Sequence, residues 1–306
     1  GMTEAIPGMV SVIIPTYKRK SILRAVNSVL MQDYKNLEVI VVDDNSDYPE
    51  YREIVRDELA EYIAENKIIL IQNSKNLGGA LARNEGILVS QGEYVAFLDD
   101  DDWYLEGKIT KQVKKLEETK ADIVYCWSRG EDQYGNVVWE NRKDIEGNLL
   151  IEAMTDCIAN TSLIMCKREA LFQVNLFEDM PCKQDVYLEL KLAIEGFVFV
   201  CEREVLVVYG NSSSDFQRIS NISPKTLVGM NKVRELARTQ YEKLTEKQIA
   251  FVEGDTAYKL CTLAKAIGDF ETYKKEYRIS LNYIHNVKKR LKLFYYMLTW
   301  KGKNNV

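Results

Sequence analysis

Short apolar runs alternate with amphipathic segments up to about residue 128. Expected strands lie at 10–14, 37–42, 67–71, 94–98 and 122–127, and expected helices near 20–32, 50–65, 78–89 and 104–119. Strands that are apolar almost throughout are typical of a parallel sheet whose two faces are covered by helices. The pattern therefore predicts an α/β fold.

The alternation changes after residue 128. A turn signal at Tyr134-Gly135-Asn136 predicts a hairpin, so the sheet is expected to become mixed. Further strands are expected at 162–166, 197–200 and 205–209, with a helix near 183–195, and the pattern beyond about 223 is helical. We therefore expect an α/β domain over 8–220 and a helical C-terminal extension over 221–306.

Polar residues collect where the first four strands end. They are Pro15 to Lys18, Asp43 to Ser46, Asn73 to Gly79, and Asp99 to Asp102. In parallel sheets ligands bind beyond the carboxyl ends of the strands, which makes these segments candidates for one site. Asp43 is expected to order its turn through Asx-type hydrogen bonds. Asp44 could order its turn in the same way, or it could contact a ligand.

Four consecutive aspartates, Asp99 to Asp102, follow an apolar strand. Because adjacent anions repel, this run indicates a bound cation. On an extended backbone Asp99 and Asp101 would point to the same side. They could then hold Mg²⁺ or Mn²⁺ while the ion keeps positions for phosphate oxygens. The alternative is a solvated acidic loop, or a helix N-terminus capped by Asp102.

Composition excludes several classes of protein. The chain has 306 residues, of which 46% are hydrophobic and 28% charged, and its net charge of −5 argues against a general nucleic-acid binder. Its six cysteines form no C-x-x-C pair and its single histidine is His285, so a zinc site is not indicated. The scattered cysteines are expected to be reduced core residues of a cytoplasmic protein. Because there is no stretch of about 18 apolar residues, we expect no membrane-spanning segment.

Four motifs taken together resemble a known family. They are the segments 10–17, 41–46, 76–84 and 97–102. In this order and spacing they closely resemble the family-2 glycosyltransferases of the GT-A fold, of the kind found in bacterial polysaccharide synthesis. The resemblance implies a Rossmann-like mixed sheet flanked by helices. It extends less distinctly to about residue 210, where Lys183-Gln184-Asp185 resembles the family's general-base motif.

The resemblance implies an inverting hexosyltransferase assisted by Mn²⁺ or Mg²⁺. Such an enzyme moves a sugar from a nucleotide-diphosphate donor, here a UDP-sugar, to an acceptor hydroxyl. The acceptor would be a saccharide or a lipid-linked saccharide in cell-surface polysaccharide or glycolipid synthesis. These substrates, rather than nucleic acid, are the expected partners.

By position in the family motifs, seven residues are expected at the donor nucleotide: Pro15, Thr16, Tyr17, Asp44, Arg83, Asp99 and Asp100. Asp44 would accept the uracil N–H, and Tyr17 would lie against the base. Pro15 and Thr16 would shape the floor of that pocket. Asp100 is grouped with these nucleotide-binding residues, although the family often has an uncharged residue at its position.

The remaining positions concern the diphosphate, the metal and the acceptor. Arg83 would bind phosphate oxygens, and Asp99 would lie near the ribose and diphosphate. Asp101, with Asp99, would ligate the metal. Asp185 would deprotonate the acceptor hydroxyl. The structural alternative for Asp185 is stabilisation of its own helix N-terminus.

The C-terminal segment has a different character. From 286 to 306 it carries six Lys or Arg side chains and no acidic residue, and positions 291, 294, 295 and 298 share one helical face. A basic amphipathic helix of this kind over 286–303 can bind the anionic inner face of the plasma membrane peripherally. The alternative is that this face packs on the domain or in a homodimer.

Two other functions are weighed against transfer. A nucleotidyltransferase shares the nucleotide-binding sheet and the carboxylate-bound metal, but such enzymes commonly begin with a Gly-rich loop, and the segment 15–19 has no glycine. A catalytically inactive sugar-nucleotide-binding protein is the non-enzymatic alternative, against which the intact aspartates argue.

Overall fold

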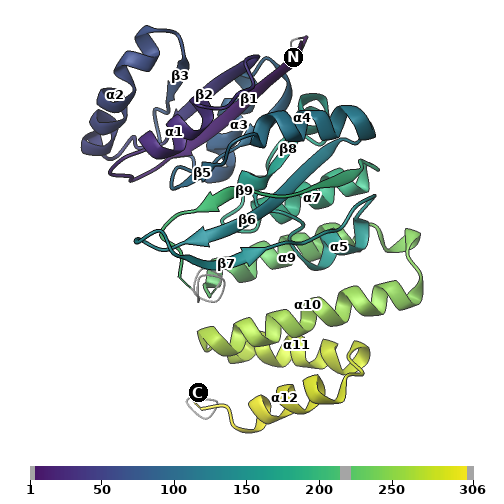
Figure 1. Ribbon diagram of the computed structural model, residues 1–306. Coiled ribbons are helices and arrows are strands. Elements are labelled where there is room, and N and C mark those ends of the chain that lie inside the picture. Colours follow the sequence, from purple (N-terminus) through teal and green to yellow (C-terminus); the bar gives the residue numbers. More distant parts are fainter. Residues whose placement is uncertain (1–3, 214–221, 302–306) are drawn as a thin grey trace. The chain divides into compact units, whose positions relative to one another are not determined.

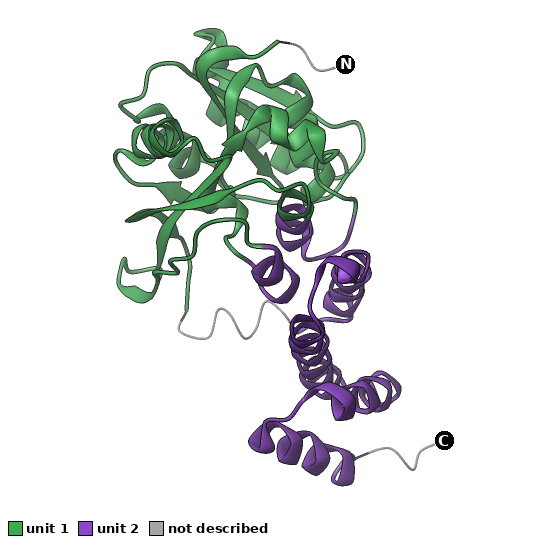
Figure 2. Ribbon diagram, turned by 90° about the vertical axis from the view of Figure 1, so that its right-hand side faces the viewer, with its two compact units in different colours: residues 1–149, 158–179, 191–214 green, residues 150–157, 180–190, 215–306 purple. Residues whose placement is uncertain are grey.

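The computed structural model describes residues 4–213 and 222–301. The chain forms two compact units (Figure 2). Unit 1 comprises residues 1–149, 158–179 and 191–214, and unit 2 comprises residues 150–157, 180–190 and 215–306. The predicted domain boundary between residues 220 and 221 lies outside the described residues.

Unit 1 is built on a nine-stranded sheet whose first part is parallel (Figure 1). Four strands in the order β3-β2-β1-β4 make up this part: β1 (Ile6–Thr16), β2 (Leu37–Asp43), β3 (Ile68–Gln72) and β4 (Gly92–Phe97). The helices between them are α1 (Leu23–Leu30), α2 (Pro49–Ala64) and α3 (Gly79–Val89). The predicted strand and helix alternation is confirmed, with the buried strands forming the core.

The rest of the sheet is mixed, as predicted. It contains β8 (Ile164–Lys167), β6 (Ile123–Glu131), β9 (Phe199–Tyr209), β5 (Asp102–Tyr104) and β7 (Val137–Asn141), with η1 (Thr161–Leu163) and α6 (Arg168–Gln173) beside β8. Strand β8 is antiparallel to β4 and to β6, whereas β9 is parallel to β6. The predicted hairpin joins β6 to β7, and Gly135 in its turn has a φ of 82°, which favours glycine.

Two local predictions are wrong. The two strands expected at 197–200 and 205–209 are replaced by one continuous strand, β9, which begins at Phe199. The helix expected from residue 104, α4 (Lys108–Thr119), begins only after Gly107. The reason is that Asp102 to Tyr104 pair with β9 as β5, with Asp102 opposite Tyr209. Asp102 is therefore a strand residue and not a helix cap.

Strand register brings the polar loops of unit 1 to one edge. Thr16 lies opposite Asp43, and Asp43 lies opposite Gln72, so β1, β2 and β3 end level with one another. Phe97, the last residue of β4, lies opposite Ile13, so β4 ends three residues before the end of β1 at Thr16. The acidic residues that follow β4 therefore lie beside the end of β1. The strand order also reverses between β1 and β4, and such a reversal is where open α/β sheets bind ligands.

Unit 2 is helical, as predicted for the C-terminal region. Its helices are α5 (Leu150–Thr155), the first part of α7 (Gln184–Ile194), α9 (Pro224–Arg238), η2 (Tyr241–Lys243), α10 (Glu246–Ile267), α11 (Phe270–Tyr283) and α12 (Val287–Leu298). Thr245 and Gln248 form a capping box that starts α10, and Asp269 and Asn286 cap α11 and α12. Figure 1 shows these last three helices side by side.

The last three helices of unit 2 share a small core. Tyr273, Leu293 and Trp300 are buried in it together with Cys261. No helix within 4–213 or 222–301 is long and apolar enough to cross a bilayer.

Candidate active site

The four aspartates after β4 form a tight turn. The Asp102 N–H donates a hydrogen bond of 3.1 Å to the Asp99 carbonyl. The extended backbone assumed for Asp99 and Asp101 is therefore wrong, although both side chains stay accessible, at 37% and 32% exposed. Asp100 and Asp102 are buried. The turn thus offers two carboxylates to solvent and uses the other two internally.

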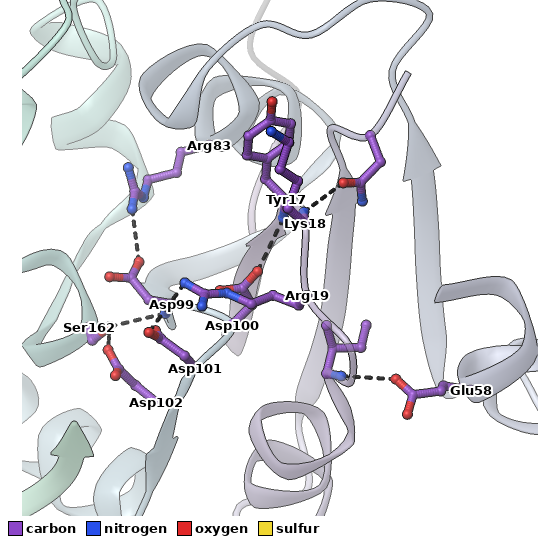
Figure 3. Close-up of polar contacts among 12 residues, drawn as sticks. Tyr17, Lys18, Arg19, Glu58, Arg83, Asp99, Asp100, Asp101, Asp102 and Ser162 are labelled. Atoms are coloured by element: carbon purple, nitrogen blue, oxygen red, sulfur yellow. Dashed lines mark hydrogen bonds and ion pairs between the residues drawn. The ribbon is translucent and has the colours of Figure 1, made fainter. Parts of the chain in front are cut away.

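Two arginines form ion pairs with three of these aspartates (Figure 3). Arg19, from the loop after β1, places Nε 2.8 Å from Asp100 Oδ1 and Nη2 3.2 Å from Asp101 Oδ2. Arg83, from α3, places Nη2 2.8 Å from Asp99 Oδ1. Both guanidinium groups therefore lie at the carboxyl ends of β1 and β4. There they could also bind phosphate oxygens.

Burial perturbs the two inner aspartates. It raises the pKa of Asp100 to about 6, although the Arg19 guanidinium and a 3.1 Å hydrogen bond from the Tyr17 N–H oppose the change. Burial also raises the pKa of Asp102 well above its ordinary value, and the neighbouring Asp99 and Asp101 add to the effect. Burial is thus the main cause of the raised pKa of both groups, and neighbouring carboxylates add to it at Asp102.

Ser162 ties the turn to η1. Its hydroxyl donates to Asp102 Oδ2 at 3.2 Å and accepts a hydrogen bond from the Asp99 N–H at 3.0 Å. The serine lies 60 or more residues away in sequence, so no local pattern pointed to it. Arg19 was missed as well, although an acidic run at one strand end calls for a cation on the neighbouring one.

Asp44 organises the loop between β3 and α3. Its Oδ1 accepts hydrogen bonds from Asn73 Nδ2 and the Leu77 N–H, each at 2.9 Å. Its Oδ2 accepts from Asn76 Nδ2 and the Gly78 N–H, each at 3.0 Å. Four donors match the roughly four lone-pair sites of a carboxylate. A uracil N–H would therefore have to replace one of them.

Asp43 orders its turn, as predicted. Its buried Oδ1 accepts a hydrogen bond from the Asn45 N–H at 3.0 Å, which is an Asx-type turn. The Asn45 side chain in turn accepts from the Lys18 N–H at 2.7 Å. These bonds fix the loop after β1 against the loop after β2.

The residues expected at the nucleotide base lie at the end of β1. Pro15 and Thr16 are its last residues, and Thr16 is buried. Tyr17 is 42% exposed, and its ring lies edge-on to Tyr48 with centroids 5.9 Å apart. Because its N–H is bound to Asp100, the backbone of Tyr17 is held beside the acidic turn, and its ring extends away from Asp100 (Figure 3). An aromatic face in that position can stack on a base.

Arg83 is held close to the start of α3. Helix α3 begins after Gly78, whose φ of 83° favours glycine. A Cβ atom on Gly79 would lie 3.2 Å from Arg83 Nη1, so the small residue leaves room for the guanidinium. The buried Nε of Arg83 has no hydrogen-bond partner among the described residues. The Arg83 Nε–H is therefore available to donate a further hydrogen bond.

Unit 1 thus brings together every predicted site residue except Asp185. Asp185 belongs to unit 2, in the first turn of α7. Its Oδ1 accepts a hydrogen bond of 2.8 Å from the Val186 N–H, and its Oδ2 lies 3.4 Å from the Cys157 thiol. A carboxylate there fits the helix dipole as well as a catalytic role, so its role stays a prediction.

The described residues contain no group of three or more His, Cys, Asp or Glu side chains arranged to hold a metal ion. The chemistry of the acidic turn nevertheless suits Mg²⁺ or Mn²⁺. Both prefer oxygen ligands, and Mg²⁺ sites commonly use one or two carboxylates while substrate phosphates complete the coordination. Asp99 and Asp101 are the accessible carboxylates of the turn.

Sequence comparison gives a family. The model of glycosyl transferase family 2 matches residues 11–180. An uncharacterized glycosyltransferase of Rickettsia bellii is 36% identical over 199 residues, or 64% of this chain and 28% of that protein. The chain spans less than a third of the length of the three Rickettsia relatives it matches.

Two other relatives have more informative names. TuaG of Bacillus subtilis, named as a teichuronic acid biosynthesis glycosyltransferase, is 30% identical over 66% of this chain and 78% of its own length. WfaP of Escherichia coli is 36% identical over 38% of this chain and 45% of its own length. Its name is UDP-Glc:alpha-D-GlcNAc-diphosphoundecaprenol beta-1,3-glucosyltransferase.

Solved structures confirm the GT-A fold. Staphylococcus aureus TarS 1–349 in complex with UDP-GlcNAc superposes with a TM-score of 0.59 at 17% identity, over 90% of this chain and 91% of that one. The mannosyltransferase PcManGT from Pyrobaculum calidifontis, in complex with GDP-Man and Mn²⁺, gives 0.56 at 20% identity, over 89% and 86%. The predicted mixed sheet flanked by helices is their shared architecture.

Proposed function

Because this chain belongs to glycosyl transferase family 2, we propose that it moves a sugar from a UDP-sugar to an acceptor hydroxyl with inversion at the anomeric carbon. The product would enter a cell-surface polysaccharide or glycolipid, as the name of TuaG suggests for that relative. One observation carries the proposal. At the reversal of strand order, the turn Asp99 to Asp102 meets two arginines and an exposed tyrosine.

The nucleotide would lie across the ends of β1 and β2. Tyr17 would stack on the base above a floor of Pro15 and Thr16, and Asp44 would accept the base N–H. Asp100 would support this arrangement from below through its bond to the Tyr17 N–H. The UDP-GlcNAc complex of TarS supports a uridine donor for a protein of this fold.

The diphosphate would lie at the acidic turn. Arg83 and Arg19 supply guanidinium groups that could move from carboxylates to phosphate oxygens. Asp99 and Asp101 would hold Mn²⁺ or Mg²⁺, an arrangement that the Mn²⁺ complex of PcManGT supports. When bound, the ion supplies positive charge to the diphosphate leaving group. The same argument explains why arginines from the loop after β1 and from α3 lie beside the carboxylates of the turn.

Asp185 would act as general base. The acceptor hydroxyl must lose its proton as its oxygen attacks the anomeric carbon, and the bond from that carbon to the diphosphate breaks on the opposite side. The proton would pass to the Asp185 carboxylate. Its position in the first turn of α7 and the family motif Lys183-Gln184-Asp185 support this role.

A lipid-linked saccharide is the proposed acceptor, and the inner face of the plasma membrane the proposed location. The name of WfaP includes a diphosphoundecaprenol acceptor. In α12 the apolar face predicted from the sequence is exposed, which supports binding to a membrane surface, and packing on the domain or in a homodimer stays the alternative. The side chains of this face are Leu291 (62% exposed), Phe294 (49%), Tyr295 (62%) and Leu298 (58%). Residues 302–306 of this segment lie outside the described residues.

A panel of nucleotide sugars tests the proposal. We would measure thermal unfolding with UDP-glucose, UDP-GlcNAc and GDP-mannose, each with and without Mn²⁺. A donor present at 100 times its dissociation constant stabilises the folded state by about 2.7 kcal/mol. We expect a UDP-sugar to raise the unfolding temperature, and more so with Mn²⁺. The absence of any shift at saturating concentrations would contradict the proposed donor.

A further inference from the structure

Unit 2 contains a cavity of about 710 Å³ whose lining residues all belong to that unit. Sites for small molecules usually measure about 300–1,000 Å³. The walls come from α5, the start of α7, α9, α10 and α12, together with the residues that precede α9. None of the residues that we assign to donor binding lines this cavity.

Part of the lining is apolar and buried. Met154, Val186, Val233 and Leu263 are each 8% exposed or less, and Tyr296 adds an aromatic surface from α12. Surface of this kind favours an apolar ligand because burial removes both surfaces from water. A sugar or nucleotide alone would leave much of it uncovered.

The other part of the lining is cationic. Lys183, Arg234, Lys259 and Lys292 line the cavity together with two carboxylates, Asp156 and Asp255, and Lys259 Nζ lies 2.8 Å from Asp255 Oδ2. The Arg234 side chain is 4% exposed, and its terminal nitrogens pair with Glu276 at 2.8 and 2.6 Å. Its buried Nε has no partner among the described residues. Because Arg234 and Lys259 already pair with carboxylates, Lys183 and Lys292 are the lining cations that favour an anionic group on the ligand.

The cavity also adjoins Asp185 within unit 2. Cys157 lines it, and the Cys157 thiol lies 3.4 Å from Asp185 Oδ2. Lys183 and Val186, which flank Asp185 in the sequence, line it as well. A ligand in the cavity would therefore end close to the proposed general base.

Helix α12 links this cavity to the exposed apolar surface. Lys292 and Tyr296 line the cavity, whereas Leu291 and Tyr295, their immediate neighbours in the sequence, are 62% exposed. A ligand leaving a membrane that contacts α12 would meet cationic and aromatic side chains of the same helix. This juxtaposition favours an amphipathic ligand that comes from a lipid surface.

We propose that the cavity of unit 2 binds the phosphate-bearing lipid part of the acceptor. The apolar chain would lie along Val186, Val233 and Leu263, with the phosphate at the lysines, so that the sugar hydroxyl is presented to Asp185. The inference rests on the proposed function, because it assigns the acceptor of that reaction. The binding itself can be measured without any transfer.

Farnesyl monophosphate is a suitable probe, since it combines an isoprenoid chain with one phosphate. Calorimetry on the full chain would compare it with farnesol and with inorganic phosphate. We expect saturable one-to-one binding of farnesyl phosphate, at least tenfold tighter than either fragment. Equal binding of farnesol would overturn the role of the cations, and equal binding of inorganic phosphate would overturn the role of the apolar wall.

Ala266→Trp narrows the cavity at an exposed position of α10, so it leaves the core of the helices intact. We expect it to weaken farnesyl phosphate binding by about tenfold or more through overpacking. Ala60→Trp, at an exposed position of α2 in unit 1, is the matched control and should change nothing. Lys292→Gln should weaken binding by about two- to fivefold, as expected for an exposed charge.

The donor serves as an independent check on the same protein. If UDP-sugars bind but farnesyl phosphate does not, the cavity assignment is wrong while the proposed function stands. If farnesyl phosphate binds and Ala266→Trp weakens its binding, while no nucleotide sugar binds, the cavity binds an isoprenoid phosphate but the proposed donor is wrong. Equal binding by wild type and Ala266→Trp would place the probe elsewhere and overturn the inference.

Discussion

In unit 1 four carboxylates share one turn and two arginines pair with three of them, whereas in unit 2 four cationic side chains and two carboxylates line a partly apolar cavity. The first site is hydrogen-bonded and rich in oxygen ligands. The second combines apolar side chains with lysines that have no acidic partner among the described residues of the cavity wall, such as Lys292. The contrast indicates that the two units bind different substrates of the reaction. A diphosphate with a metal suits the first, and an amphipathic anion suits the second.

This contrast also concerns the source of the site residues. The donor residues follow three neighbouring strands that end at one sheet edge, with Arg83 added from α3. The cavity is lined by residues from separate helices. The proposed catalytic residue Asp185 lies on one of these helices, α7. A substitution in one unit should therefore leave ligand binding by the other unit unchanged.

The largest expected effect is on transfer. Asp185→Asn keeps the size of the side chain but cannot take a proton, so transfer should fall by roughly 10²–10⁴-fold, mainly in kcat. UDP-sugar binding in unit 1 should stay normal. Glu235→Gln, at an exposed position of α9, is the control for a lost charge in unit 2. If Asp185→Asn transfers sugar at a near wild-type rate, Glu178, Asp179 and Glu189 become the carboxylates to test.

The buried pair Arg234 and Glu276 should dominate the stability of unit 2. Glu276→Leu leaves a buried guanidinium unpaired, so the free energy of unfolding should fall by about 3–5 kcal/mol in a urea titration. The double variant Arg234→Met, Glu276→Leu should recover most of the loss. If Glu276→Leu is as stable as wild type, the ion pair of Arg234 and Glu276 does not stabilise unit 2.

Vesicle binding should show a smaller effect. Leu291→Glu, at 62% exposure on α12, removes about 1.5–3 kcal/mol of apolar burial, so binding to anionic vesicles should weaken at least tenfold. Leu281→Glu, at 42% exposure on α11, is the matched control and should bind like wild type. If neither variant changes sedimentation with vesicles, but Leu291→Glu dissociates a dimer, the α12 face is a subunit interface.

The sequence predicted the first half of unit 1 well, because its signals are local. Apolar runs such as Val10 to Ile14 identified the parallel strands, and polar residues after each strand identified the site edge. The turn geometry of Asp99 to Asp102 was not predictable in the same way. It depends on β5 pairing with β9, whose residues lie about 100 positions later in the chain.

The partners of the site were harder to predict than its charged residues. Arg19 and Ser162 reach the acidic turn through tertiary contacts that leave no periodic pattern. The cavity of unit 2 is the extreme case, since its lining extends from Met154 to Tyr296 in sequence. Helical periodicity showed which segments are helices, but not that Arg234 and Lys292 would line the same space.

The central claim is that the acidic turn binds a nucleotide diphosphate together with a metal, and UDP calorimetry with and without Mn²⁺ tests it most directly. Asp101→Ala removes an accessible carboxylate, and Asp57→Ala removes an exposed one on α2 as a control. We expect Mn²⁺ to tighten UDP binding to wild type and to Asp57→Ala, and Asp101→Ala to lose about tenfold in affinity along with the Mn²⁺ dependence. Equal affinity and equal metal dependence in all three proteins would contradict the account.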